Sequence, residues 1–191
     1  MSLITVLRRA SQGDVTNREM QHLHLAARMI DKGLLKKQVE QYTGLPETTL
    51  KKMYIGLRGR HSKTGRPTVT HRFLEKAEFC LAGSIHLRYY LSLTGLPNKA
   101  RLSNESEVDI DAFIRSYEQA KSFTPAVEGF DANLALMIVK EYCHRDIFLE
   151  KCHRCSFHYA VHCEKINTSC PLCTINSSEL KVLPTDTSQP H

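Results

Sequence analysis

The sequence predicts a mainly α-helical protein that ends in a small cysteine-rich ribbon. Apolar residues recur at helical spacing over most of the first 146 residues, whereas the alternation typical of strands is not convincing before residue 147. Two Cys-x-x-Cys pairs then lie close together near the C terminus. The 191 residues suffice for one domain, or for one domain with a small appendage. With 41% hydrophobic and 24% charged residues, the composition is that of a globular protein and not of a disordered or fibrous one.

Each expected helix is marked by an apolar stripe and by residues that begin or end helices. The first helix begins with a capping box formed by Thr16 and Glu19 and ends near Gly33. A short helix at about 34–42 follows, and after a glycine turn Pro46 can open a third helix, because its fixed φ suits the first turn. The remaining helices are expected at about 71–94, 110–117 and 134–142.

The two cysteine pairs are the strongest chemical signal. Cys152 and Cys155 form the first pair, fourteen residues follow, and Cys170 and Cys173 form the second. Each pair can make a tight turn that aims two sulfurs at one point, so together they supply the tetrahedral thiolate shell of structural zinc. Such a closed shell leaves no position for water, which argues against a catalytic metal. Short strands that would frame the turns are expected at 148–151 and 157–161.

Other roles for these cysteines stay open. Disulfides need an oxidising compartment, and the apolar start of the chain is followed at once by Arg8 and Arg9, unlike a secretory signal. A thioredoxin-like site needs one pair at a strand-to-helix junction, and an iron–sulfur cluster also takes four cysteines. One structural Zn²⁺ per chain in a cytoplasmic protein is the interpretation we adopt. Residues that could replace one of the four ligands are Cys163, His153, His158 and His162.

Residues 36–54 have the pattern of a helix–turn–helix. Gly44 stands where the turn needs a residue that tolerates positive φ, and Leu50 and Met53 fall on the inner face of the second helix. Thr and Lys side chains on its outer face could reach base edges and phosphates, as a major-groove helix does. A basic loop at 58–67 follows. The candidate DNA contacts are Thr48, Lys51, Lys52, Arg58, Arg60, Lys63 and Arg66.

The charge of the chain is unevenly placed. The net charge is +6, but residues 1–76 alone contain 15 Lys or Arg against 6 Asp or Glu. If these Lys and Arg side chains lie on one face of the protein, they would attract a polyanion such as DNA. If they are scattered, they form an ordinary solvated surface. No apolar run approaches the roughly 20 residues of a membrane helix. No nucleophile–base pair, phosphate-binding loop or carboxylate pair suggests an enzyme.

The order of these motifs resembles the FlhC family, the C subunits of bacterial flagellar master transcriptional activators. The matching stretch is AARMIDKGLLKKQVEQYTGLPETTLKKMYIGLRG at 26–59, and the long helix and both cysteine pairs follow it in the family's order. The resemblance covers about residues 17–175. It implies a zinc site at the four cysteines and a hetero-oligomer with the FlhD subunit, which binds flagellar promoter DNA and recruits RNA polymerase. Cys163 is an additional thiol, and the tail after Cys173 has only Lys181 as a basic residue.

The sequence therefore predicts three segments. A helical body at 1–146 contains the helix–turn–helix at about 34–56, a four-Cys zinc ribbon occupies 147–176, and a flexible tail occupies 177–191. The predicted function is that of the DNA-binding subunit of a transcriptional activator. The alternative is a zinc-dependent protein-interaction module without direct DNA contact, because the broad apolar surface of the helix at 71–94 could face a partner as well as the core.

Overall fold

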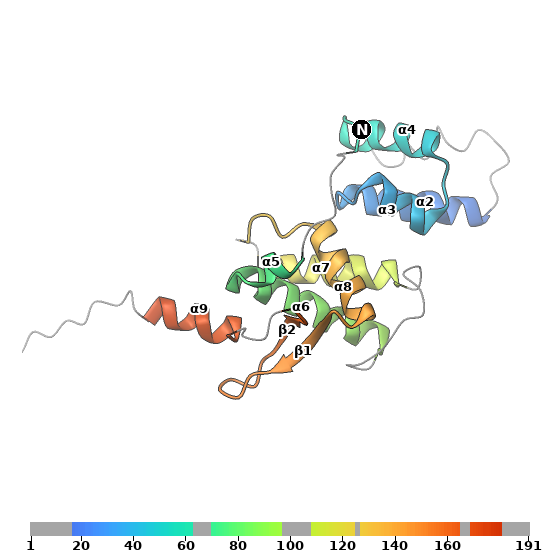
Figure 1. Cartoon of the computed structure of the whole chain (residues 1–191). Helices are drawn as coiled ribbons and strands as arrows, with labels where there is room; N and C mark the ends of the chain where they lie inside the picture. Colours follow the sequence, from blue (N-terminus) through green and yellow to red (C-terminus); the bar gives the residue numbers. More distant parts are fainter. Residues whose placement is uncertain (1–16, 63–69, 97–107, 125–126, 165–168, 181–191) are drawn as a thin grey trace, which may run out of the picture.

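The computed structural model is mainly α-helical, which confirms the predicted fold class (Figure 1). The structure describes residues 17–62, 70–96, 108–124, 127–164 and 169–180. The expected capping residue Thr16 and the end of the chain after Leu180 lie outside these ranges. The helices are α2 (Asn17–Asp31), α3 (Lys36–Thr43), α4 (Glu47–Arg58), α5 (Thr70–Leu74), α6 (Ala77–Thr94), α7 (Ile110–Phe123), α8 (Ala132–His144) and α9 (Pro171–Leu180). The strands are β1 (Ile147–Lys151) and β2 (His158–His162).

Helices α2, α3 and α4 form a unit around the predicted apolar stripe. The stripe of α2 packs against the inner face of α4, where Leu50 and Met53 are buried. Gly33 and Gly44 have φ of 85° and 64°, so each adopts the left-handed conformation that ends a helix, as their positions predicted. Pro46 lies at the cap before α4 and not in its first turn, and its carbonyl accepts the Leu50 N–H at 3.1 Å.

Side chains of α7 and α8 fasten this unit to the rest of the protein. The Asn133 side chain of α8 accepts the Leu35 N–H at 3.0 Å and donates to the Gly33 carbonyl at 3.1 Å. Just beyond the end of α2, Lys32 pairs with Glu118 of α7 at 2.6 Å. These contacts join both ends of the turn between α2 and α3 to α7 and α8. The helix–turn–helix therefore has a defined orientation relative to α7 and α8.

The prediction of one long helix at 71–94 is wrong, because the chain forms two helices, α5 and α6, over these residues. Lys76 has extended backbone, with φ −85° and ψ 125°, and it caps α6. The break turns Phe73 edge-on to Phe79, with ring centroids 5.2 Å apart. Since both sides of the break keep apolar residues at helical spacing, periodicity alone predicted one continuous helix. The predicted end of α6 at Gly95 is correct.

Helix α6 is the centre of the body and packs against α7, α8, α9 and β2. Leu87 and Leu91 of its predicted stripe are buried, but His86 is fully buried as well, which the sequence analysis did not predict. The His86 imidazole lies edge-on to the ring of Phe113, with centroids 5.5 Å apart. Burial lowers the pKa of His86 to about 4, so this side chain is a neutral part of the core at physiological pH.

The two strands form an antiparallel hairpin that lies against α6. Ile147 pairs with His162 at one end and Lys151 with His158 at the other. These bounds agree within one residue with the strands expected at 148–151 and 157–161. The buried Ala160 N–H donates to the Ser84 hydroxyl of α6 at 2.8 Å. The hairpin is therefore joined to α6 by a buried hydrogen bond. Helix α9 follows the hairpin and extends to Leu180, past the expected end of the zinc segment at 176.

Replacing Ser84 with Ala should destabilise the protein by about 1–3 kcal/mol, because the buried Ala160 N–H would lose its acceptor. Urea unfolding of the Ser84→Ala variant measures this cost. Ser92→Ala, on the exposed side of the same helix, is the matched control and should change the free energy of unfolding by less than about 0.5 kcal/mol. Equal stability of the two variants would show that the hairpin does not depend on this hydrogen bond.

Candidate metal centre and helix–turn–helix

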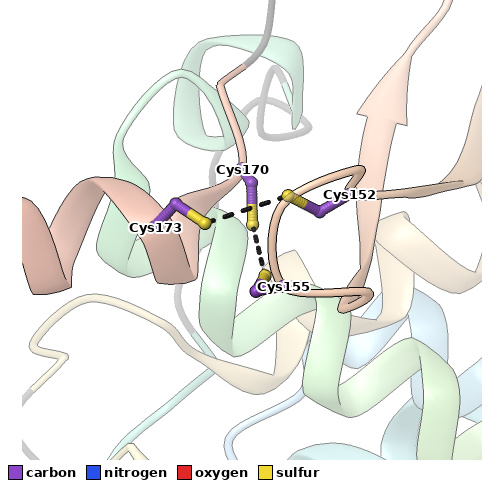
Figure 2. Close-up of side chains that lie close together, drawn as sticks. All are labelled: Cys152, Cys155, Cys170 and Cys173. Atoms are coloured by element: carbon purple, nitrogen blue, oxygen red, sulfur yellow. Dashed lines mark hydrogen bonds between the residues drawn. The ribbon is translucent and has the colours of Figure 1, made fainter.

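The four predicted cysteine ligands meet at one point (Figure 2). The Sγ atoms of Cys152 and Cys173 are 3.8 Å apart, those of Cys155 and Cys170 are 3.6 Å apart, and all four lie within 4.8 Å of one another. A tetrahedral ion with metal–sulfur bonds of about 2.3 Å holds its sulfurs about 3.8 Å apart. Each short distance joins one pair to the other pair. The cluster therefore has the spacing of a site that binds one metal ion through four thiolates.

The first pair lies in the turn between β1 and β2. The Cys152 N–H donates to the Phe157 carbonyl, and the Ser156 N–H donates to the Cys152 carbonyl, both at 2.9 Å. Ser156 has φ 60°, an uncommon conformation for a residue with a Cβ, and it turns the chain back into β2. The Arg154 N–H donates to Cys152 Sγ at 3.4 Å. The hairpin thus forms the tight turn that Cys-x-x-Cys spacing predicted.

The second pair lies at the start of α9. Cys170 precedes the helix, and its carbonyl accepts the Thr174 N–H at 3.0 Å. Pro171 occupies the first helical position, where its missing N–H costs no hydrogen bond. Cys173 follows in the same turn of helix and points toward Cys152 (Figure 2). The helix start therefore holds both sulfurs toward the hairpin.

The four thiols influence one another's pKa, because each thiolate that forms disfavours ionisation of its neighbours. Backbone N–H groups of Cys155 and Arg154 lower the pKa of Cys152 to about 6. The neighbouring Cys155 side chain raises the pKa of Cys173 to about 12, and burial raises the pKa of Cys170. Thiolates this close repel one another, so their ionisation is not independent. A divalent cation removes this repulsion and favours all four as thiolates.

The alternative ligands do not join this cluster in the described part of the chain. Cys163 is exposed, and its Sγ lies 4.0 Å from Nδ1 of the adjacent His162. His162 belongs to a different group, with His71 and Glu164. All seven cysteines lie in the described part of the chain, and none of them forms a disulfide there. The sulfur separations of 3.6 and 3.8 Å within the cluster far exceed the roughly 2.05 Å of a disulfide bond.

Comparison with known proteins assigns no family. No protein-family model matches the chain, and no curated protein matches it. Among the helices that the structure describes, none combines the length and the hydropathy that a membrane span requires. The functional interpretation therefore depends on the side chains of the site and on the sequence motifs.

Helices α3 and α4 form the predicted helix–turn–helix, and the outer face of α4 is open to solvent. Thr48, Lys51 and Lys52 are exposed. Ile55, on the same face, is 48% exposed. Figure 1 places α4 at the edge of the molecule, on the side opposite the hairpin. These side chains consequently form one accessible face, in the arrangement that the helical spacing predicted.

One carboxylate lies among these cations. Glu47, in the first turn of α4, pairs with Lys51 at 3.1 Å and also with Lys36 of α3. Lys36, followed by Lys51, lowers the pKa of Glu47. A phosphate that binds Lys51 would therefore compete with Glu47, whereas Lys52 is the exposed cation next along the helix.

Arg58 holds the α2–α4 contact together. Its Nη1 donates to the carbonyls of Ile30 at 3.2 Å and Asp31 at 2.9 Å, at the C-terminal end of α2. A guanidinium in this position satisfies helix-end carbonyls and complements the helix dipole. Of the other candidate DNA contacts, Arg60 is exposed, and Lys63 and Arg66 lie outside the described residues.

A second group of metal-ligating side chains was not predicted. It consists of His71 of α5, His162 at the end of β2, and Glu164 just beyond it. The sequence indicated His162 only as a possible replacement ligand of the four-cysteine site. His71 is far from the other two in the chain, and only the packing of α5 against β2 brings the three together.

Proposed function

We propose that this chain is a zinc-stabilised, DNA-binding subunit of a transcriptional activator. The observation that carries the proposal is the exposed face of α4, where Thr48, Lys51 and Lys52 project from a helix whose opposite face is buried. A helix of this kind places a short polar side chain and two cations where a major groove presents base edges and phosphates. The contacts of Asn133 and Lys32 support a fixed presentation of this helix.

Zinc is the proposed occupant of the four-cysteine site. Thiolates favour zinc over hard cations such as Mg²⁺ and Ca²⁺. A polynuclear iron–sulfur cluster would spread its cysteine sulfurs further apart, because they bind different iron atoms, whereas the closest sulfurs here are 3.6 and 3.8 Å apart. The ion would join the β1–β2 turn to the start of α9. Its role would be structural, since four thiolates leave no open coordination position.

The proposed partner is the FlhD subunit, and the proposed target is flagellar promoter DNA in the bacterial cytoplasm. Both follow from the resemblance of residues 26–59 and the cysteine pairs to the FlhC family. One helix reads only a few base pairs, so a long promoter element requires several such helices held at set spacing. A hetero-oligomer with FlhD would supply that spacing and present the complex to RNA polymerase.

Binding to a flagellar promoter fragment should be tight, selective over a scrambled fragment, and weaker at higher salt, because cations that neutralise phosphates release counterions. Binding is measured over a salt series, with and without co-expressed FlhD and with zinc present. The two preparations show which subunit supplies selectivity. If a soluble, zinc-loaded complex binds neither fragment, the DNA-binding proposal is wrong.

A protein-interaction module is the second candidate. Tyr89 of α6 and Phe123 of α7 are 37% and 60% exposed, and their rings stack with centroids 6.0 Å apart. Leu93, one turn further along α6, is 40% exposed. Exposed aromatic and aliphatic side chains grouped in this way are typical of protein contact surfaces. Complex formation with FlhD in the absence of any DNA binding would favour this function.

A further inference from the structure

We propose that the protein binds a second divalent transition-metal ion, such as Zn²⁺, where α5, β2 and α8 meet. The ligands would be His71, His162 and Glu164, and the carboxylate of Glu141 of α8 would lie beside the ion, with its Oε2 3.7 Å from His162 Nε2. The first three offer ligand atoms that all lie within 4.8 Å of one another. His71 Nδ1 is 3.1 Å from Glu164 Oε2, which is close to the ligand separation around a tetrahedral ion. Imidazole and carboxylate are a usual ligand set for zinc.

Glu141 provides an independent indication of a cation. Its Oε1 accepts the Thr70 hydroxyl at 2.6 Å. Its Oε2 is buried and has no hydrogen-bond partner among the described residues, although His162 Nε2 lies 3.7 Å away. A buried carboxylate oxygen without a partner is unfavourable, and burial raises the pKa of Glu141. A cation bound beside Oε2 would supply the missing interaction and favour the charged carboxylate.

The surrounding geometry is that of a metal site in two further respects. The rings of His71 and His162 are tilted by 58° with centroids 5.5 Å apart, so they do not stack and their nitrogens can approach a common point. The Thr70 hydroxyl holds the Glu141 carboxylate beside the cluster, as hydrogen-bonded groups outside the ligand shell are held in metal sites.

Metal binding has one identifiable cost. His162 Nδ1 accepts the Glu164 N–H at 3.2 Å. This acceptor role leaves the ring proton on Nε2 in a neutral imidazole, whereas a metal on Nε2 requires the proton on Nδ1. Binding through Nε2 would therefore break the contact with the Glu164 N–H. Glu164 is exposed and lies two residues beyond the end of β2. We expect this site to fill after the four-cysteine site.

The second ion would connect the hairpin to the helical body. Its ligands come from α5, from the end of β2 and from just beyond that end, whereas the four-cysteine site joins the hairpin to α9. The two ions would thus hold opposite ends of β2. This inference does not depend on DNA binding and can be tested without DNA or a partner subunit.

The test is the metal content of the full chain. After equilibration with excess Zn²⁺ and removal of unbound ions, wild-type protein should contain two ions per chain by elemental analysis. The His71→Gln/Glu164→Gln double variant should contain one. His144→Gln/Glu128→Gln changes the same residue types at exposed positions outside the cluster, and it should keep both ions. A single ion in wild type, or two ions in His71→Gln/Glu164→Gln, would overturn the proposal.

Replacing Zn²⁺ with Co²⁺ distinguishes the two metal sites by their absorption spectra, and it shows whether the ribbon of a variant is folded. Co²⁺ in the four-cysteine site should give an intense sulfur-to-cobalt absorption band, and the second equivalent of Co²⁺ should add no further intensity to it. Retention of that band in His71→Gln/Glu164→Gln would show that the ribbon is folded and only the second site is lost. Cys163→Ser should still bind two ions. Loss of the second ion in Cys163→Ser would overturn the histidine–carboxylate ligand set.

Discussion

Replacing Cys170 with Ser should remove the metal and unfold the C-terminal ribbon. Cys170 is buried and its Sγ lies 3.6 Å from Cys155 Sγ. Serine is itself a good residue to begin a helix, so the change preserves the start of α9 and deletes only the thiolate. A ribbon of two short strands has little core of its own, and metal binding supplies much of its folding free energy. The variant should lose the sulfur-to-cobalt absorption, have a lower Tm and be less soluble.

Cys163→Ser is the matched control for this experiment. Cys163 lies in the same segment, is exposed and stands apart from the cluster. Its replacement should leave the sulfur-to-cobalt absorption, Tm and solubility unchanged. If Cys170→Ser retained full metal occupancy of the four-cysteine site and normal solubility, the thiol would have no structural role, and the metal-site assignment would fail.

Reversing two charges on α4 should strongly weaken promoter binding. Lys51 and Lys52 are exposed on the face proposed to meet DNA. If each contacts a phosphate, Lys51→Glu/Lys52→Glu should flatten the plot of log K against log salt by about two units and reduce affinity by at least about tenfold. The loss should be similar for promoter and scrambled fragments, since phosphates carry no sequence information. Salt-resolved binding of the complex with FlhD measures both quantities.

A second double reversal controls for net charge. Arg115 of α7 and Lys151 of β1 are exposed and lie outside the helix–turn–helix. Arg115→Glu/Lys151→Glu changes the net charge by the same amount, so it should retain most of the affinity and the salt slope. Equal losses in the two double variants would mean that net charge, and not the face of α4, determines binding.

Arg58, which is exposed, has a structural contact that its position in the basic segment did not predict. The sequence placed Arg58 beside Lys51 and Lys52 as a candidate DNA contact. In the structure its guanidinium donates to the Ile30 and Asp31 carbonyls. That contact depends on how α2 crosses α4, which no local pattern specifies. The exposure of Lys52, by contrast, followed from its spacing to the buried Leu50 and Met53.

The sequence by itself determined the features that depend on neighbouring residues. The Cys-x-x-Cys spacing specifies two tight turns, Gly44 specifies the left-handed end of α3, and apolar periodicity specifies which face of α4 is buried. Each follows from backbone geometry or from burial of one helical face, and these are local properties.

Only the tertiary structure decided the features that join distant segments. The break between α5 and α6 accompanies the packing of Phe73 on Phe79, and the core position of His86 depends on rings from other segments. The group of His71, His162 and Glu164 exists because α5 packs against β2. Such contacts form where the whole chain can bury the most apolar surface and leave the fewest polar groups without hydrogen bonds. Their physical cause is therefore the packed core and not the spacing of residues along one segment.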